Sequence, residues 1–134
     1  MKKFLLTAGA LLFLTACSNE QGHAGHGSTA TNDKLEPLKV ALTVPKSASA
    51  GDKISLKAKV TYGKESVDKA DEVMFEIIKD NNAKSSVKEK VEHGEDGVYT
   101  LDYTFNEPGK YRVISHVTAK NQHTMPDADI VVSK

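Results

Sequence analysis

The sequence predicts an all-β domain, a sandwich of about seven short strands. Apolar residues alternate with polar ones along most of the chain after residue 37, as in strands that bury one face. Turn-forming residues such as Gly, Asn, Asp and Pro separate the alternating runs. No part of this region shows the spacing and capping residues of an amphipathic helix.

The first three strands show the clearest alternation. Residues 38–44 alternate Leu and Val with Lys, Ala and Thr until a proline interrupts the run. Residues 54–62 alternate Ile, Leu, Ala, Val and Tyr with Ser, Lys and Thr. Residues 73–77 place valine, phenylalanine and isoleucine inward, so Met74 and Glu76 are expected on the outer face.

Four further strands complete the prediction. A short polar strand is expected at 86–91, and a more regular one at 99–105. Residues 111–117 turn alternate side chains inward and leave His116 outside, and residues 130–132 form the last strand. Strands at this spacing are typical of a Greek-key sandwich of the immunoglobulin or cupredoxin-like type.

The N-terminus predicts export and lipidation. A basic start precedes an apolar stretch, residues 4–14, that is shorter than the roughly 20 residues of a permanent membrane span. Residues 14–17, LTAC, resemble the lipobox of bacterial lipoproteins, whose cysteine receives a diacylglycerol. We therefore expect a signal peptide at 1–16 and a lipidated Cys17 that holds the chain on the extracytoplasmic face of the cell membrane. The alternative is an ordinary signal peptide with a chance cysteine.

A flexible tether is predicted between the anchor and the domain. Residues 17–36 are rich in Gly, Ser, Thr, Asn and Ala and have almost no apolar residues to bury. His23 and His26 lie in this segment and are either weak metal ligands or solvated residues of a linker. The folded domain is expected to span 37–134.

Composition excludes several classes of function. The 18 basic and 18 acidic residues form no basic stripe, which argues against nucleic-acid binding. The only cysteine is the lipidation site, so no thiol remains for a disulfide, a zinc–thiolate site or a blue-copper centre. An enzyme is not expected, because the sequence shows no activated nucleophile, phosphate loop or paired carboxylates.

Four side chains suggest a copper site. Strands 73–77 and 111–117 are neighbours in an immunoglobulin-type sandwich, so Met74 and His116 could be adjacent on its outer face. The following loop is expected to carry His123 and Met125 back over the end of that sheet. Thioether and imidazole ligands favour Cu(I), and methionine argues against zinc.

Other interpretations of these residues remain open. A surface histidine is often simply solvated, and Met74 could instead cover a neighbouring strand. His93 is a weaker candidate ligand whose position the pattern does not predict. Glu76, on the same face as Met74, could bind Cu(II) or be solvated.

The domain also resembles a known family, the YtkA-like or FixH-like extracytoplasmic proteins, over roughly residues 38–132. The resemblance lies in the segments VMFEI at 73–77, DGVY at 96–99, PGKYRV at 108–113, and His116 with HTMP at 123–126. It implies copper handling and assembly of respiratory oxidases. A cytochrome oxidase subunit or another copper protein would then be the partner.

Two functional hypotheses follow from the sequence. The first is a membrane-anchored Cu(I) chaperone or buffer that uses His116, His123, Met125 and Met74. The second is a metal-free immunoglobulin-like module that docks another membrane protein through the outward-facing Ile78 and Ile114, since exposed apolar clusters often mark such surfaces.

Overall fold

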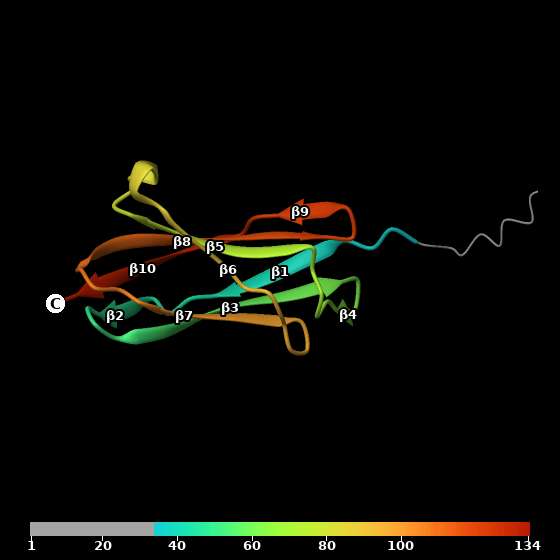
Figure 1. The fold of residues 1–134 in the computed structure, drawn as a ribbon, viewed down its shortest axis with the longest axis horizontal. Helices are drawn as coiled ribbons and strands as arrows, with labels where there is room; N and C mark the ends of the chain where they lie inside the picture. The colour runs from blue at the N-terminus through green and yellow to red at the C-terminus, as the bar shows by residue number, and fades with distance from the viewer. Residues whose placement is uncertain (1–33) are drawn as a thin grey trace, which may run out of the picture. The chain divides into compact units, whose positions relative to one another are not determined.

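The computed structural model describes residues 34–134, and Leu35–Lys134 form one compact unit (Figure 1). The predicted signal peptide 1–16 lies outside the described residues, as does most of the predicted tether with Cys17, His23 and His26. No helix in residues 34–134 is long and apolar enough to cross a membrane.

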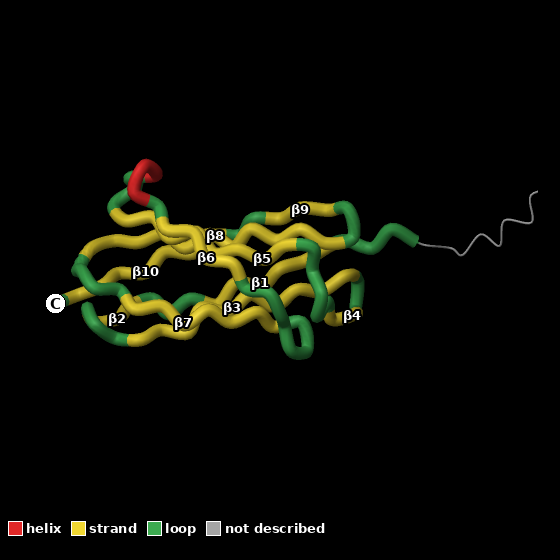
Figure 2. Tube along the Cα trace, viewed as in Figure 1, coloured by secondary structure: helices red, strands yellow, loops and turns green. Residues whose placement is uncertain are grey.

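The described chain consists almost entirely of strands and turns (Figure 2). All seven predicted strands are present, and three short ones accompany them. In chain order the elements are β1 (Leu38–Thr43), β2 (Ser47–Ser49), β3 (Lys53–Tyr62), β4 (Glu65–Ser66), β5 (Glu72–Lys79), the 3-10 helix η1 (Ala83–Ser85), β6 (Val87–Lys90), β7 (Val98–Thr104), β8 (Gly109–Ala119), β9 (Gln122–Thr124) and β10 (Asp127–Ser133).

Two sheets stack face to face and confirm the predicted sandwich (Figure 1). In the first sheet, β3 pairs antiparallel with β1 on one side and with β7 and β4 on the other. The second sheet has the order β2-β10-β8-β5-β6, with β9 also paired to β8. The expected neighbours β5 and β8 pair antiparallel along eight residues of β5.

The last part of the chain differs from the prediction. Thr118 pairs with His123 in β9, and Ile114 pairs with Asp127 in β10, so both strands keep one register along β8. Between them Ser115 N–H donates to the Pro126 carbonyl at 3.0 Å, which carries the same register across the interruption. Proline has no N–H to continue the ladder, which separates β9 from β10. His123 and Met125 therefore lie within the sheet rather than on a loop over its end.

A tight turn begins this returning strand. Lys120 and Asn121 both have positive φ, 52° and 58°, as the two central residues of a type I′ hairpin turn require. The turn reverses the chain directly after β8, so β9 is held against the strand that precedes it.

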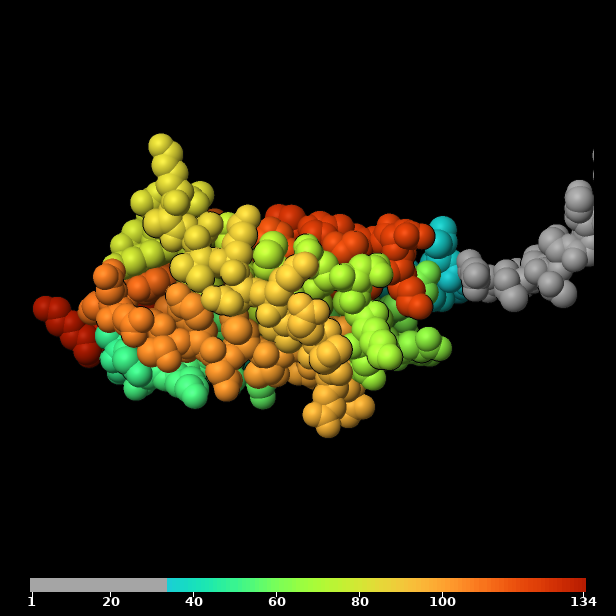
Figure 3. Space-filling model, viewed as in Figure 1, coloured from blue at the N-terminus to red at the C-terminus, as the bar shows by residue number. Residues whose placement is uncertain are grey.

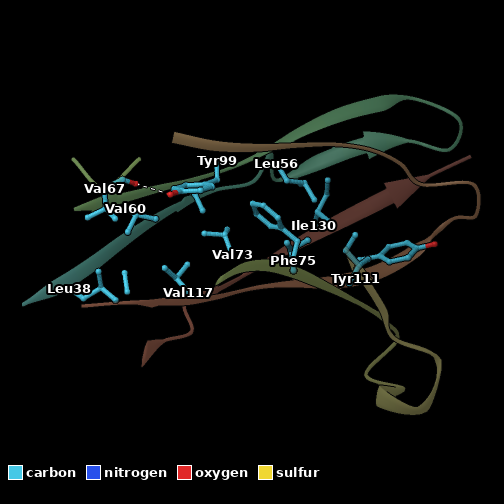
Figure 4. Close-up of a cluster of buried hydrophobic side chains, with 14 of the residues drawn as sticks. Leu38, Leu56, Val60, Val67, Val73, Phe75, Tyr99, Tyr111, Val117 and Ile130 are labelled. Atoms are coloured by element: carbon cyan, nitrogen blue, oxygen red, sulfur yellow. Dashed lines mark hydrogen bonds between the residues drawn. The ribbon is translucent and has the colours of Figure 1, made fainter. Parts of the chain in front are cut away.

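The inward-facing residues of both sheets form one apolar core (Figure 4). Phe75, Val113 and Val117 are fully buried, as the alternation predicts. Each such side chain contributes about 1.5–3 kcal/mol relative to an exposed one. Tyr99 spans the core and donates its hydroxyl to the Val67 carbonyl at 2.9 Å (Figure 4).

The chain joins the domain beside the β8–β9 turn (Figure 3). The Gln122 side chain donates to the Glu36 carbonyl at 2.8 Å and accepts from Leu38 N–H at 3.0 Å. The Tyr62 hydroxyl accepts from Glu36 N–H at 3.1 Å. Glu36, the last residue of the predicted tether, is therefore already bound to the domain.

A tyrosine closes the corner before β8. Tyr111 donates its hydroxyl to the Glu107 carbonyl at 2.8 Å, four residues upstream, in the arrangement expected of this fold type. Its ring packs edge-on against Phe105 with 4.8 Å between centroids. Burial raises the pKa of Tyr111 above its usual value, and the phenol stays a hydrogen-bond donor through neutral pH.

We expect Tyr111→Phe to lower the free energy of unfolding by about 1 kcal/mol, because a buried hydrogen bond is lost while the ring remains. The melting temperature should fall by roughly 4–8 °C in a domain of this size. Tyr103→Phe is the matched control, since the Tyr103 ring also packs on Phe105 but its hydroxyl bonds to nothing in residues 34–134. Equal losses in the two variants, measured by thermal unfolding, would contradict a corner held by the hydroxyl.

Candidate functional site

Three predicted ligands lie in one row across the second sheet. Met74 on β5 is directly opposite His116 on β8. The register on either side of Met125, Val117 with Thr124 and Ile114 with Asp127, places Met125 opposite His116 from the other side. Directly opposed residues share a sheet face and have Cβ atoms about 4.5–5.5 Å apart. We call Met74, His116 and Met125 the Met/His row.

His123 lies beside this row on the same face. It pairs with Thr118, which is two residues from His116 and therefore points to the same side of the sheet. The rings of His116 and His123 have centroids 6.2 Å apart and planes inclined by 36°. Two imidazoles on one metal have centroids within roughly 6 Å, because each metal–nitrogen bond is about 2 Å. The separation of the two rings is therefore close to the upper limit for two imidazoles on one ion.

Glu76 orients His116. The His116 Nε2 atom is 2.8 Å from a Glu76 carboxylate oxygen, and the two side chains are only 16% and 13% exposed. The hydrogen bond with His116 lowers the pKa of Glu76 and is the largest effect on it. Burial opposes this shift, whereas smaller contributions from Ser86 and Lys88 add to it, and the pKa is lowered overall. The ionised carboxylate can only accept, so Nε2 carries the proton and Nδ1 keeps its lone pair in the neutral ring. The structure thus makes Glu76 a partner of His116.

His123 is held through its other nitrogen. Its Nδ1 atom is 2.8 Å from the Thr118 hydroxyl oxygen, which can donate or accept. That contact does not use Nε2, which remains for a ligand. Each of the two imidazoles therefore has one nitrogen fixed by the protein and one left over, as in metal sites where outer-shell partners orient the ligating ring.

The four side chains differ in exposure. His116 and Met74 are partly buried in the sheet surface, whereas His123 is exposed and Met125 keeps 51% of its surface accessible. The cluster is therefore shallow and open on the side of β9. A bound ion here would remain within reach of a second protein.

The other predicted site residues are not brought to this cluster. His93 is exposed in the loop between β6 and β7 and makes no hydrogen bond or ring contact with the cluster. Ile78 and Ile114 face outward as expected but are half-buried. Within residues 34–134, no three His, Cys, Asp or Glu side chains converge on a common point.

Sequence reasoning did not identify the two orienting contacts. Glu76 is two residues along β5 from Met74 and diagonal to His116, so the alternation placed it on the correct face. Whether the Glu76 carboxylate binds a metal or bonds to His116 depends on side-chain rotamers, which the alternation does not predict. Thr118 could have been noticed only by placing His123 in a strand.

Family comparison agrees with the fold and the anchor. The model of the YtkA-like family matches residues 32–116, more than half of the chain. The chain belongs to the YtkA-like family. The matched part of this YtkA-like domain ends at His116, so His123 and Met125 lie beyond it. Residues 1–18 match the prokaryotic membrane lipoprotein lipid attachment site, which contains Cys17, and the protein is therefore a lipid-anchored membrane protein.

Solved structures with a similar fold include superoxide reductase (neelaredoxin) from Ignicoccus hospitalis. Two structures of that protein superpose with TM-scores of 0.53 and 0.52, at 13% and 14% sequence identity. The superpositions cover 77% of this YtkA-like chain and 86% and 87% of the reductase chains. At this identity the likeness concerns the β-sandwich alone. A comparison with curated proteins finds no match.

In the metal-free protein, at a pH where the ring is neutral, we expect His116 to carry its proton on Nε2. Glu76→Ala removes the acceptor and should let both tautomers populate, which long-range proton–nitrogen NMR spectra distinguish. Thr118→Val is the matched control, because it removes the partner of His123 and should leave the His116 signals unchanged. A proton on Nδ1 of His116 in the unmodified protein would contradict the orienting role of Glu76.

Proposed function

We propose that this lipoprotein is an extracytoplasmic copper-binding protein, a Cu(I) carrier or buffer held at the membrane by its lipid. The observation that carries the proposal is the Met/His row with His123 beside it on one accessible face. Met74, His116, His123 and Met125 are the proposed ligands.

The chemistry of this donor set favours Cu(I). Thioether sulfur and neutral imidazole are soft to borderline ligands, whereas calcium, magnesium and manganese prefer oxygen. Zinc sites use thiolate, imidazole and carboxylate, and the only cysteine of the chain is at the lipidation site. The carboxylate of Glu76 supports the set from outside, because a histidine that donates one N–H to a carboxylate is a better-oriented ligand.

The shallow position of the cluster suits transfer rather than storage in a closed site. The half-exposed Met125 is at the open edge, where an acceptor protein could replace it as a ligand. Membership in the YtkA-like family supports a role in copper handling and in assembly of the copper centre of cytochrome oxidase. An oxidase subunit or another copper protein is the proposed recipient, and the proposed role is binding and delivery without catalysis.

The proposal is tested by anaerobic Cu(I) titration of the mature chain against a coloured chelator. One equivalent of Cu(I) should be retained in competition with the chelator. Glu76→Gln should weaken Cu(I) binding by about 10- to 100-fold, the usual effect of losing a residue that orients a metal ligand. His123→Ala and Met125→Leu each remove a proposed ligand and should weaken binding by at least about 100-fold. His93→Ala is the control, since that exposed histidine lies elsewhere, and its affinity should not change.

The copper proposal would be overturned if the unmodified chain did not retain Cu(I) in competition with the chelator. It would also be overturned if His123→Ala, Met125→Leu and His93→Ala all bound Cu(I) with equal affinity. A metal-free docking module is then the remaining candidate. The feature that favours it is the half-exposed pair Met125 and Val131 on the outer face that also carries Ile114. Such a module would bind its partner whether or not copper is present.

A further inference from the structure

The outer face of the first sheet carries a net positive charge, which corrects the expectation that the basic residues form no stripe. Alternation in β1 and β3 buries the apolar residues and turns four exposed lysines to the outside. Their cross-strand neighbours are threonine, alanine and valine, which add no charge. We call this surface the lysine face, and its cations are Lys39, Lys53, Lys57 and Lys59.

Few acidic groups oppose these lysines. Asp102 is the only acidic residue on the β1, β3 and β7 positions of this face, and it accepts a hydrogen bond from the Ser55 hydroxyl at 2.6 Å. Glu95 lies at the rim, opposite Val98. None of the four lysines forms an ion pair with any residue in the described part of the chain.

The outer face of the second sheet is different. Its strands β5, β6, β8 and β10 present equal numbers of cations and carboxylates, and several of them are paired. Lys90 lies 3.0 Å from Glu72, and Arg112 lies 3.3 Å from Asp129. The members are Lys88, Lys90, Lys110 and Arg112 against Glu72, Glu76, Asp127 and Asp129. The net positive charge is therefore confined to the lysine face of the first sheet, whereas the total formal charge of the chain is zero.

We propose that the lysine face rests on the anionic headgroups of the membrane in which the protein is anchored. The lipid brings a bilayer permanently close to the domain, which raises the effective concentration of headgroups at any basic surface. A lipid anchor combined with a basic patch is a common pairing of membrane signals. Each lysine near an anionic surface increases the partition of the domain onto that surface by about fivefold.

The chain is long enough to permit this contact. Sixteen residues, 18–33, separate Cys17 from the described part of the chain. A segment of this length spans at most roughly 55 Å, more than the length of β3, which at ten residues is about 33 Å. The anchor therefore does not prevent the domain from lying on its first sheet.

This orientation would turn the second sheet away from the bilayer. The two sheets form opposite faces of the sandwich, so the Met/His row would be presented to other proteins rather than to lipid. The proposal goes beyond copper binding and does not depend on it, because the lysine face contains none of the proposed ligands.

The test uses the full lipidated protein in vesicles. Because Cys17 is its only cysteine, a single added thiol can carry a fluorophore. Thr100→Cys places the label on the lysine face and Val131→Cys places it on the outer face of the second sheet. Quenching by a headgroup-linked quencher is compared in phosphatidylglycerol and in phosphatidylcholine vesicles, at low and high salt.

We expect the label at residue 100 to be quenched several-fold more strongly than the label at 131 in phosphatidylglycerol only. High salt should remove the difference, because it screens exposed charges. The double substitution Lys57→Glu with Lys59→Glu should abolish it, whereas Lys88→Glu with Lys110→Glu, an equal charge change on the other sheet, should preserve it. Equal quenching of both labels, a quenching difference that does not depend on lipid charge, or equal loss of that difference in both double variants would overturn the proposal. An acidic protein would then replace the membrane as the candidate partner of the lysine face.

Discussion

The arrangement of the proposed site depends on one strand register. The chain turns at Lys120 and Asn121 and then follows β8 without a shift, through the interruption at Pro126, to the C-terminal residues of β10. Side chains in a strand alternate between faces, so a slip of one residue would turn His123 and Met125 toward the core. Burial of Ile130 and Val132 in the core opposes such a slip and so holds the histidine and the methionine outside.

The same pairing explains how a surface cluster can be ordered. β8 is central in its sheet, and His116 therefore has neighbours on both sides, Met74 on β5 and Met125 beyond β9. Short contacts between neighbouring strands then fix the rings, from Glu76 to His116 and from Thr118 to His123. Rigid strands with oriented side chains make a more precise binding site than a flexible loop would. The copper proposal rests on this geometry.

Much of the fold could be predicted from alternation alone, because a half-buried strand leaves a period of two in the sequence. The inward-facing residues of β5 and β8 were predicted correctly for this reason. The predicted position of His123 and Met125 was wrong in detail. A loop was expected after residues 111–117, whereas the chain forms β9 there and keeps its register along β8 past Pro126. The Glu76–His116 bond could not be predicted, because diagonal contacts depend on rotamers that no sequence pattern records.

In the proposed site, two thioethers and two imidazoles on one sheet face bind the same Cu(I) ion. X-ray absorption spectroscopy of the Cu(I)-loaded mature chain tests this most directly, since sulfur and imidazole nitrogen scatter differently. Both kinds of scatterer are expected around copper, with sulfur scattering reduced in Met125→Leu. A spectrum of nitrogen ligands alone, unchanged in that variant, would contradict it.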